Sequence, residues 1–141
     1  MSARWFPDDM PLPAVSRETL PWWQAASAHH LLVQACRVCG RRQLPPGPLC
    51  RRCRSRDLDW HEVPGTGVVH TYTVVYRAPI PSLATRPPYV VVVVELDDGG
   101  GARLVSNLVG EPVPQPCVGL AVRVVWEDVG AGVAVPRFEP A

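Results

Sequence analysis

The chain has 141 residues and a formal net charge of +1 at pH 7, with 47% hydrophobic and 19% charged residues. This length allows one ordinary domain, or a small domain with an appended module, and the apolar fraction suffices for a packed core. The low charged fraction suggests that a partner covers part of the surface, and no run approaches the roughly 20 apolar residues of a membrane-spanning helix.

The first residues, MSARWFPDDMPLP, lack the apolar stretch of a secretory signal peptide. We therefore expect a cytoplasmic protein, in which cysteine side chains stay reduced. Paired C-x-x-C motifs in that compartment favour a metal site over disulfides.

The N-terminal part of the chain predicts an extended arm followed by one helix. Residues 1–15 are rich in proline and have no regular apolar pattern. The segment SRETLPWWQAASAHH predicts a short helix from about Pro21 to His29, with Thr19 as its N-cap. The following LLVQAC is typical of an extended strand, and it leads into the first pair of cysteines.

Four of the five cysteines form two C-x-x-C pairs separated by ten residues: Cys36, Cys39, Cys50 and Cys53. Four thiolates at this spacing are typical of a tetrahedral metal site; zinc is the first choice, and iron has the same ligand set in rubredoxin-like sites. Because four protein ligands fill a tetrahedral shell, we expect a structural site rather than a catalytic one. Gly40 after the first pair suits a tight turn, whereas Arg54 at the matching position suits it less well.

Arginine supplies every basic side chain, and seven of the 14 lie between Cys36 and Arg56. Guanidinium groups bind phosphate and carboxylate through paired hydrogen bonds, so this cluster suits an anionic partner. Single-stranded nucleic acid, a CoA-like phosphate and an acidic protein surface all remain open as that partner. Ordinary solvent exposure is the alternative for any one of these side chains.

After the second cysteine pair the pattern changes to β-branched runs, many with a period of two. These runs predict five strands, at Gly67–Tyr76, Tyr89–Leu96, Ala102–Val109, Leu120–Glu127 and Val133–Phe138. Five strands with a longer connection after the third suit a small closed barrel such as an OB-fold. Closure would also protect the YVVVVVEL run from pairing with other chains along an open edge.

The sequence contains no Ser-His-Asp set, no paired carboxylates and no Gly-rich phosphate loop. Cys117 stands alone in a proline-rich loop, where we expect a small buried thiol, with a nucleophile as the alternative. His70 lies within a predicted strand and is expected to be packed rather than to act as a base. Tyr72, Tyr76 and Tyr89 suit either base stacking or core packing.

Taken together, the two cysteine pairs, the run GTGVVHTYTVV and the strand PPYVVVVVEL resemble the DUF35 family of zinc-ribbon and OB-fold proteins associated with acyl-CoA metabolism. The resemblance covers about residues 17–140, and the AHH segment and the long DDGGGAR turn depart from it. It implies a mainly β chain with a short N-terminal helix, a rubredoxin-like zinc ribbon and a five-stranded OB-fold barrel. We expect these three parts to occupy residues 1–30, 31–60 and 61–141.

The resemblance also implies a function. Members of this family are expected to be non-catalytic accessory subunits that dock on a thiolase-superfamily enzyme and help to position an acyl-CoA, for condensation or for retro-aldol cleavage such as that of steroid side-chain thioesters. A partner of a hydratase-like acyl-CoA enzyme and a single-stranded nucleic-acid binder are the alternatives. The implied zinc ligands are Cys36, Cys39, Cys50 and Cys53. The candidates for contact with CoA phosphates are Arg41, Arg42, Arg51 and Arg52.

Overall fold

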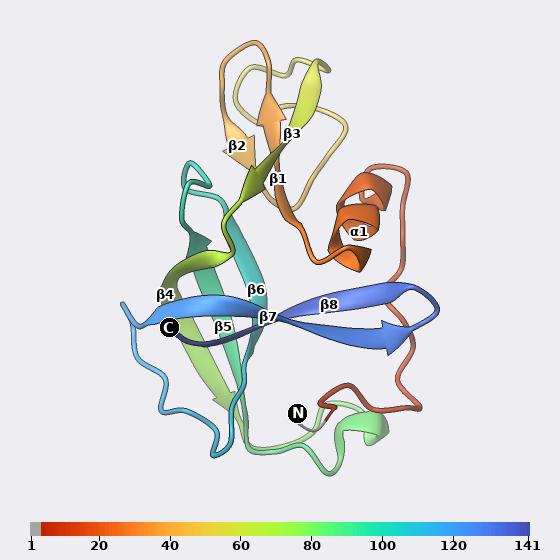
Figure 1. The fold of residues 1–141 in the computed structure, drawn as a ribbon, viewed down its shortest axis with the longest axis vertical. Coiled ribbons are helices and arrows are strands. Elements are labelled where there is room, and N and C mark those ends of the chain that lie inside the picture. The colour runs from red at the N-terminus through yellow and green to blue at the C-terminus, as the bar shows by residue number, and fades with distance from the viewer. Residues whose placement is uncertain (1–3) are drawn as a thin grey trace.

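A small three-stranded sheet stands on one end of a closed five-stranded barrel in the computed structural model, which describes residues 4–141 (Figure 1). The elements are α1 (Leu20–Ser27), β1 (Leu31–Cys36), β2 (Arg42–Gln43), β3 (Leu58–Val63), β4 (Thr66–Val75), the 3-10 turn η1 (Pro81–Leu83), β5 (Tyr89–Leu96), β6 (Arg103–Leu108), β7 (Ala121–Gly130) and β8 (Val133–Pro140). No helix within residues 4–141 has the length and apolar character needed to cross a membrane.

The predicted fold class is confirmed: one short α-helix, a ribbon and a closed barrel of five strands. The bounds of β5 are those predicted, and the other four barrel strands differ by one to three residues at an end. Thr19 occupies the predicted N-cap position, but its side chain hydrogen-bonds with Ser16 and makes no capping bond to the helix.

The barrel closes because β4 pairs with β5 on one side and with β7 on the other. The strand order around the barrel is β4-β5-β6-β8-β7, with a short parallel contact between β6 and β8. Gly67 lies where β4 pairs with both neighbours, and a Cβ atom there would lie 2.3 Å from the carbonyl oxygen of Glu95. A side chain at this position would therefore force β4 away from β5.

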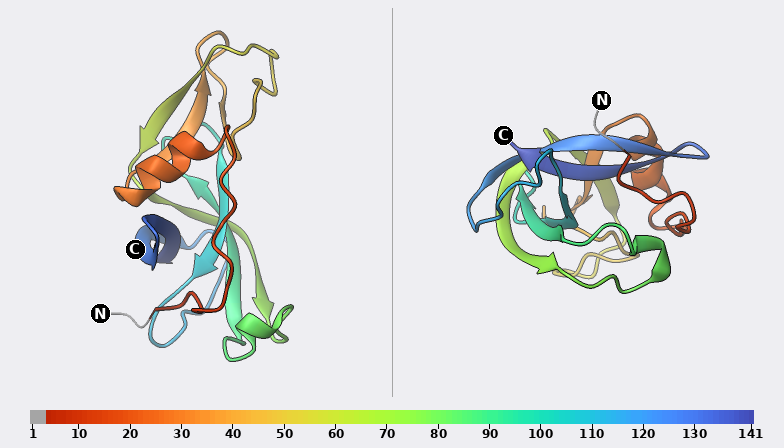
Figure 2. Two further views of the ribbon diagram at one scale, coloured as in Figure 1. Left: turned by 90° about the vertical axis from the view of Figure 1, so that its right-hand side faces the viewer. Right: turned by 90° about the horizontal axis from the view of Figure 1, so that it is seen from below.

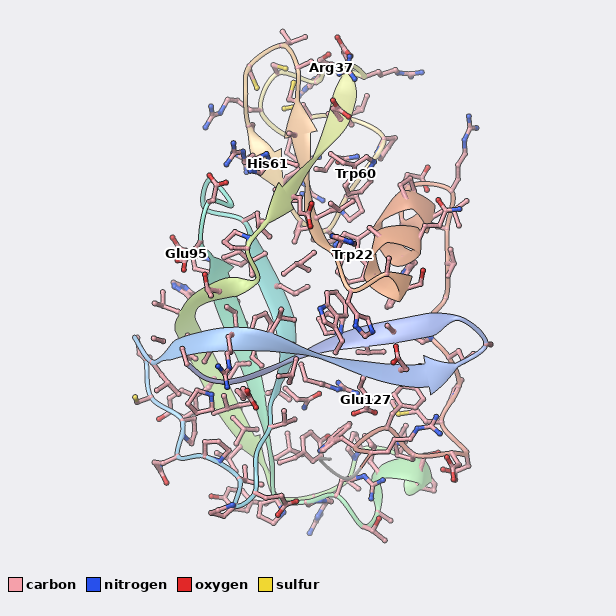
Figure 3. All side chains as sticks on the ribbon, viewed as in Figure 1. Trp22, Arg37, Trp60, His61, Glu95 and Glu127 are labelled. Atoms are coloured by element: carbon pink, nitrogen blue, oxygen red, sulfur yellow. The ribbon has the colours of Figure 1, made fainter. Side chains whose placement is uncertain are left out.

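The ribbon and the barrel share one apolar core. The fully buried barrel residues Val92, Val94 and Phe138 belong to the same cluster as Val33 of β1 and Trp22 of α1. Burying a valine or leucine side chain contributes roughly 1.5–3 kcal/mol, so this continuity favours a fixed arrangement of the two parts. Figure 3 shows Trp22 between α1 and the ribbon, where its indole N–H donates to the carbonyl oxygen of Leu32 at 3.0 Å.

Two histidine–carboxylate contacts lie on the surface around this shared core. His29 after α1 contacts Asp128 of β7 at 2.9 Å, and its ring stacks on Trp126 with 5.5 Å between ring centroids. On the other side, His61 of β3 contacts Asp98 in the turn between β5 and β6 at 2.8 Å. Exposed pairs contribute about 0–1 kcal/mol each, so they help to orient the ribbon rather than hold it in place.

The N-terminal arm is extended and lies against the barrel, which Figure 2 shows as a strand-like path from the lower end of the molecule up to α1. Glu127 anchors it by accepting hydrogen bonds from the backbone N–H groups of Trp5 at 3.1 Å and Phe6 at 2.6 Å. The Trp5 ring packs edge-on against Tyr89 and lies 4.7 Å from the guanidinium carbon of Arg137. The arm is therefore part of the folded structure.

Candidate functional site

Two tight turns carry the four cysteines at the tip of the ribbon. In the first, the N–H of Gly40 donates to the carbonyl oxygen of Cys36 at 3.0 Å; in the second, the N–H of Arg54 donates to that of Cys50 at 2.9 Å. Both turns end in the left-handed region, with φ of +77° at Gly40 and +64° at Arg54. The second turn therefore has the same backbone as the first, although an arginine occupies the position that favours glycine.

The turns bring the sulfur atoms of Cys36, Cys39, Cys50 and Cys53 within 4.8 Å of one another. The Sγ atoms of Cys36 and Cys53 are 3.6 Å apart, and those of Cys39 and Cys50 are 3.5 Å apart. A tetrahedral zinc ion with Zn–S bonds of about 2.3 Å needs sulfurs about 3.8 Å apart. The four predicted cysteines therefore lie together in a geometry that fits such an ion. Because they would fill all four coordination positions, a substrate would have none left to occupy.

Backbone N–H groups favour thiolate at two of these sulfurs. The N–H of Cys39 lowers the pKa of Cys36, and the N–H groups of Cys53 and Arg52 lower the pKa of Cys50 to about 6. At Cys53 the N–H of Ser55 lowers the pKa, but burial and the three neighbouring sulfurs outweigh it and raise the pKa to about 11. Crowded sulfurs thus oppose full ionisation, and a divalent cation supplies the charge that would stabilise four thiolates.

Two buried glutamines hold the loop that leads to Cys50. Gln43 donates to the side-chain oxygen of Gln34 at 2.8 Å and accepts a hydrogen bond from the N–H of Arg51 at 3.0 Å. Gln34 donates to the carbonyl oxygen of Gly47 and accepts from its N–H, both at 3.0 Å. Sequence reasoning missed this pair, although an uncharged polar residue two positions before a cysteine in an apolar strand was a usable signal.

The arginines of the ribbon differ in how far they are free to bind an anion. Arg37, which Figure 3 shows at the far end of the ribbon, contacts Asp59 at 2.9 Å, and Arg42 contacts Asp98 at 3.0 Å. Hydrogen bonds from His61 and Arg42 lower the pKa of Asp98, which keeps this carboxylate charged.

The other three CoA-phosphate candidates have no carboxylate partner among the described residues. Arg51 donates to the carbonyl oxygen of Pro45 at 2.6 Å, and Arg52 has an exposed side chain. Arg41 is half-buried, and its Nε atom is buried without a hydrogen-bond partner within residues 4–141. The guanidinium groups of Arg41, Arg51 and Arg52 therefore have N–H donors free to bind an anion, whereas Arg42 is already paired with the carboxylate of Asp98.

Two predictions about single residues are wrong. Cys117 is exposed rather than buried, and His70 is exposed at a bulge of β4, where the pairing with β5 shifts between Val69 and Thr71. A bulge leaves its extra residue outside the strand ladder, which is why the simple alternation failed at this point. Of the three tyrosines, Tyr89 is a core residue, whereas Tyr72 and Tyr76 are exposed.

A cleft of about 540 Å³ lies where β6 and β8 diverge, beneath the N-terminal arm. Its buried charges are already engaged: Glu127 binds the arm, and Arg137 donates to Asn107 at 2.6 Å and lies 3.9 Å from Glu127. Burial lowers the pKa of Arg137, and the nearby carboxylate opposes that shift. Trp5 and Trp126 add apolar walls, and the lining contains no nucleophile paired with a base.

Replacing Arg54 with glycine tests the strain in the second turn. The left-handed conformation costs a non-glycine residue about 1–2 kcal/mol, and glycine adopts it without that cost. Arg52→Gly is the matched control, because it removes the same charge from the same turn at a residue without positive φ. We expect the metal-loaded Arg54→Gly protein to have a free energy of unfolding about 1–2 kcal/mol above that of Arg52→Gly. Equal values from denaturant unfolding would show that Arg54 is not strained.

Comparison with known proteins agrees with this architecture. Residues 23–59 match the family described as "ChsH2, rubredoxin-like zinc ribbon domain", and residues 60–127 match "ChsH2, C-terminal OB-fold domain". A solved chain of the "Ltp2-ChsH2(DUF35) aldolase" is 39% identical, with a TM-score of 0.79, over 92% of this chain and 98% of that one.

Curated relatives include a "Probable enoyl-CoA hydratase alpha subunit" from Thermomonospora curvata, 40% identical over 93% of this chain and 40% of the relative. A "DUF35 domain-containing scaffold protein" from Methanocaldococcus jannaschii is 29% identical over 77% of this chain and 75% of the relative. The chain thus spans about two fifths of the first relative and three quarters of the second. The fold, the clustered cysteines and these matches together show that the chain belongs to the DUF35 family of zinc-ribbon and OB-fold proteins.

Proposed function

We propose that the chain is a non-catalytic accessory subunit that docks on a thiolase-superfamily enzyme and helps to position an acyl-CoA. The observation that carries this proposal is the match over nearly the full length of a chain of the "Ltp2-ChsH2(DUF35) aldolase". The scaffold name of the archaeal relative supports the same kind of role. The partner enzyme then supplies the catalytic side chains for condensation or retro-aldol cleavage.

The chemistry of the described residues supports an accessory role. The cysteine cluster has four ligands for a four-coordinate ion, so substrate has no open metal position. The carboxylate–histidine contacts involving His29, His30 and His61 connect elements of the fold rather than flank a nucleophile. Within residues 4–141, the cysteines therefore suit metal binding, and the histidines suit contacts between elements.

A hydratase-like enzyme is the second candidate for the partner, because the relative at 40% identity is named as a hydratase alpha subunit. This chain matches only 40% of that relative, so the name describes a protein that has a large part without a counterpart here. Nucleic acid is a weaker alternative. The barrel arginines Arg103, Arg123 and Arg137 lie close to glutamates, which leaves the barrel without a basic track for a phosphate backbone.

We propose that the cysteine cluster holds a structural zinc ion. An all-thiolate set suits zinc when its sulfur atoms lie as close as those of Cys36 and Cys53, at 3.6 Å, and of Cys39 and Cys50, at 3.5 Å. Iron is the alternative occupant. The segment between β1 and β3 contributes few side chains to the shared core, so an ion would supply much of the free energy that orders it.

We further propose that the ribbon arginines contact the phosphates of the shared acyl-CoA. Arg41, Arg51 and Arg52 are the stronger candidates, because they have no carboxylate partner, whereas Arg42 is paired with Asp98. Guanidinium groups bind phosphate through paired hydrogen bonds, and their free donors suit this role.

Replacing Cys50 with serine tests the metal site. Cys50 is 1% exposed and lies in the cluster, whereas Cys117 is exposed and lies outside it. We expect Cys50→Ser to lose its zinc, measured by elemental analysis, and to exchange amide hydrogens faster across residues 36–57. Cys117→Ser should keep one ion per chain and the exchange pattern of the original protein. Full zinc content in Cys50→Ser would contradict the assignment of the ligands.

Reversing a charge on the ribbon tests the contact with phosphate. For the assembled enzyme, we expect Arg52→Glu to raise the KM for acyl-CoA about tenfold with little change in kcat, because the lost contact is remote from the reacting atoms. Arg17→Glu, which changes an exposed arginine near α1, is the control and should leave KM within twofold. An unchanged KM in Arg52→Glu, together with unchanged values in Arg41→Glu and Arg51→Glu, would remove the ribbon from the CoA site.

Co-expression tests the docking itself. We expect the chain to co-purify with the thiolase-superfamily enzyme encoded nearest to its gene, and to form a complex of fixed stoichiometry by light scattering. A hydratase-like enzyme from the same region serves as the competing bait. Stable association with the hydratase alone would favour the second candidate, and association with neither would contradict an accessory role.

A further inference from the structure

Strand β4 has a neighbour on both sides over only part of its length. It pairs with β5 from Gly67 to Val75, but with β7 only from Thr66 to Val68. Beyond that point, backbone hydrogen bonds on the β7 side reach Val69 alone, from Gly119 and to Leu120. In Figure 1 the lower half of β4 accordingly runs below β7 with β5 beside it. Thr71–Val75 therefore form an open sheet edge in the part of the chain that the structure describes.

The side chains along this edge are correspondingly uncovered. Tyr72 lies opposite Val92 of β5, and in turn Val92 lies opposite Ser106 of β6. Val92 is fully buried and Ser106 is 9% exposed, yet Tyr72 is 41% exposed. The difference arises because no strand covers the side of Tyr72 that faces away from β5, so an added strand there would bury its ring.

The edge lacks the features that usually prevent pairing with another chain. Residues 71–76 are Thr-Tyr-Thr-Val-Val-Tyr, with no charge, proline or glycine among them. Uncharged edges rich in β-branched and aromatic residues are templates for a further strand, and free proteins normally blunt them. The adjacent outer face of the sheet is apolar too, since Val105 is 65% exposed. A permanently uncovered edge of this kind would be a site of aggregation.

Basic side chains stand only at the two ends of the edge. His70 is exposed at the bulge before it, and Arg77 is exposed after it, with no ion pair in residues 4–141. A segment that pairs with Thr71–Val75 thus meets an uncharged strip and then a free guanidinium group. This arrangement favours an uncharged extended segment that carries an acidic residue beside Arg77.

We propose that an extended segment of the partner enzyme adds to β4 as an antiparallel strand along Thr71–Val75, with an acidic residue against Arg77. This inference rests on the proposed function and names the surface through which the chain docks. Main-chain hydrogen bonds at the edge supply affinity, and burial of Tyr72 and Tyr76, which is 78% exposed, supplies an aromatic anchor. The added strand continues the β4–β5–β6 sheet.

Amide hydrogen exchange on the isolated chain and on its complex with the co-purified enzyme tests this surface. We expect at least tenfold slower exchange within residues 71–76 in the complex, while residues 133–138, already paired in β8, change little. A complex that forms without protection of residues 71–76 would overturn the inference and leave the proposed function intact. Failure to form any complex would overturn both. Protection in the isolated chain that grows with its concentration would show that a second copy occupies the edge, which also overturns the inference.

A charge reversal provides an independent test. Arg77→Glu should weaken binding to the enzyme about tenfold at low ionic strength, and the loss should shrink as salt screens the charges. Arg17→Glu has the same change in net charge at an exposed site away from the edge and should shift Kd less than twofold. Equal affinities for the two variants would show that no acidic group lies beside Arg77.

Discussion

The four sulfur atoms at the tip of the ribbon are the constraint on which the rest of its structure depends. Between Val33 and Val63 the shared core gains only partly buried apolar side chains, Leu44 and Trp60 among them. Apolar burial alone is therefore small for this segment, and the polar network of Gln34 and Gln43 is satisfied only when the loop to Cys50 is in place. An ion that joins both turns would fix the loop, the glutamines and the arginines together.

The cysteine cluster also indicates a structural rather than a catalytic role for the metal site. Four thiolates would complete the shell of a tetrahedral ion, so the proposed zinc site would offer a substrate no open coordination position. The base of the ribbon continues into the barrel through Val33 and Trp22, which gives the ribbon arginines a defined position relative to the barrel strands. A rigid body that offers anion-binding side chains at one end and an open strand edge on its barrel suits a partner that positions a ligand for another protein.

Local sequence patterns predicted the elements well where a run of residues alone determines the structure. The YVVVVVEL strand has the predicted bounds because Val90–Glu95 pair with strands on both sides and its residues strongly favour β structure. The cysteine spacing likewise predicted the cluster, because short turns fix each pair locally. Arg54 showed that a turn can impose its backbone on an unfavourable residue.

The remaining features depend on contacts between residues far apart in the sequence. Nothing near Glu127 indicates that it binds the backbone of Trp5, and nothing near His29 indicates its contact with Asp128. The bulge at His70 and the half-paired edge after it likewise follow from barrel closure, since β7 leaves β4 after Val68. Periodicity assigns a residue to one face of a strand, but it cannot show which strand, if any, lies alongside.

The measurement that most directly tests the accessory role compares acyl-CoA turnover by the purified zinc-loaded chain, by the partner enzyme and by their complex, each at matched concentration. We expect no turnover by the chain alone, and higher kcat/KM for the complex than for the enzyme alone. Turnover by the isolated chain, at a rate unaffected when partner is added, would contradict a role in which this protein positions a substrate for the chemistry of another.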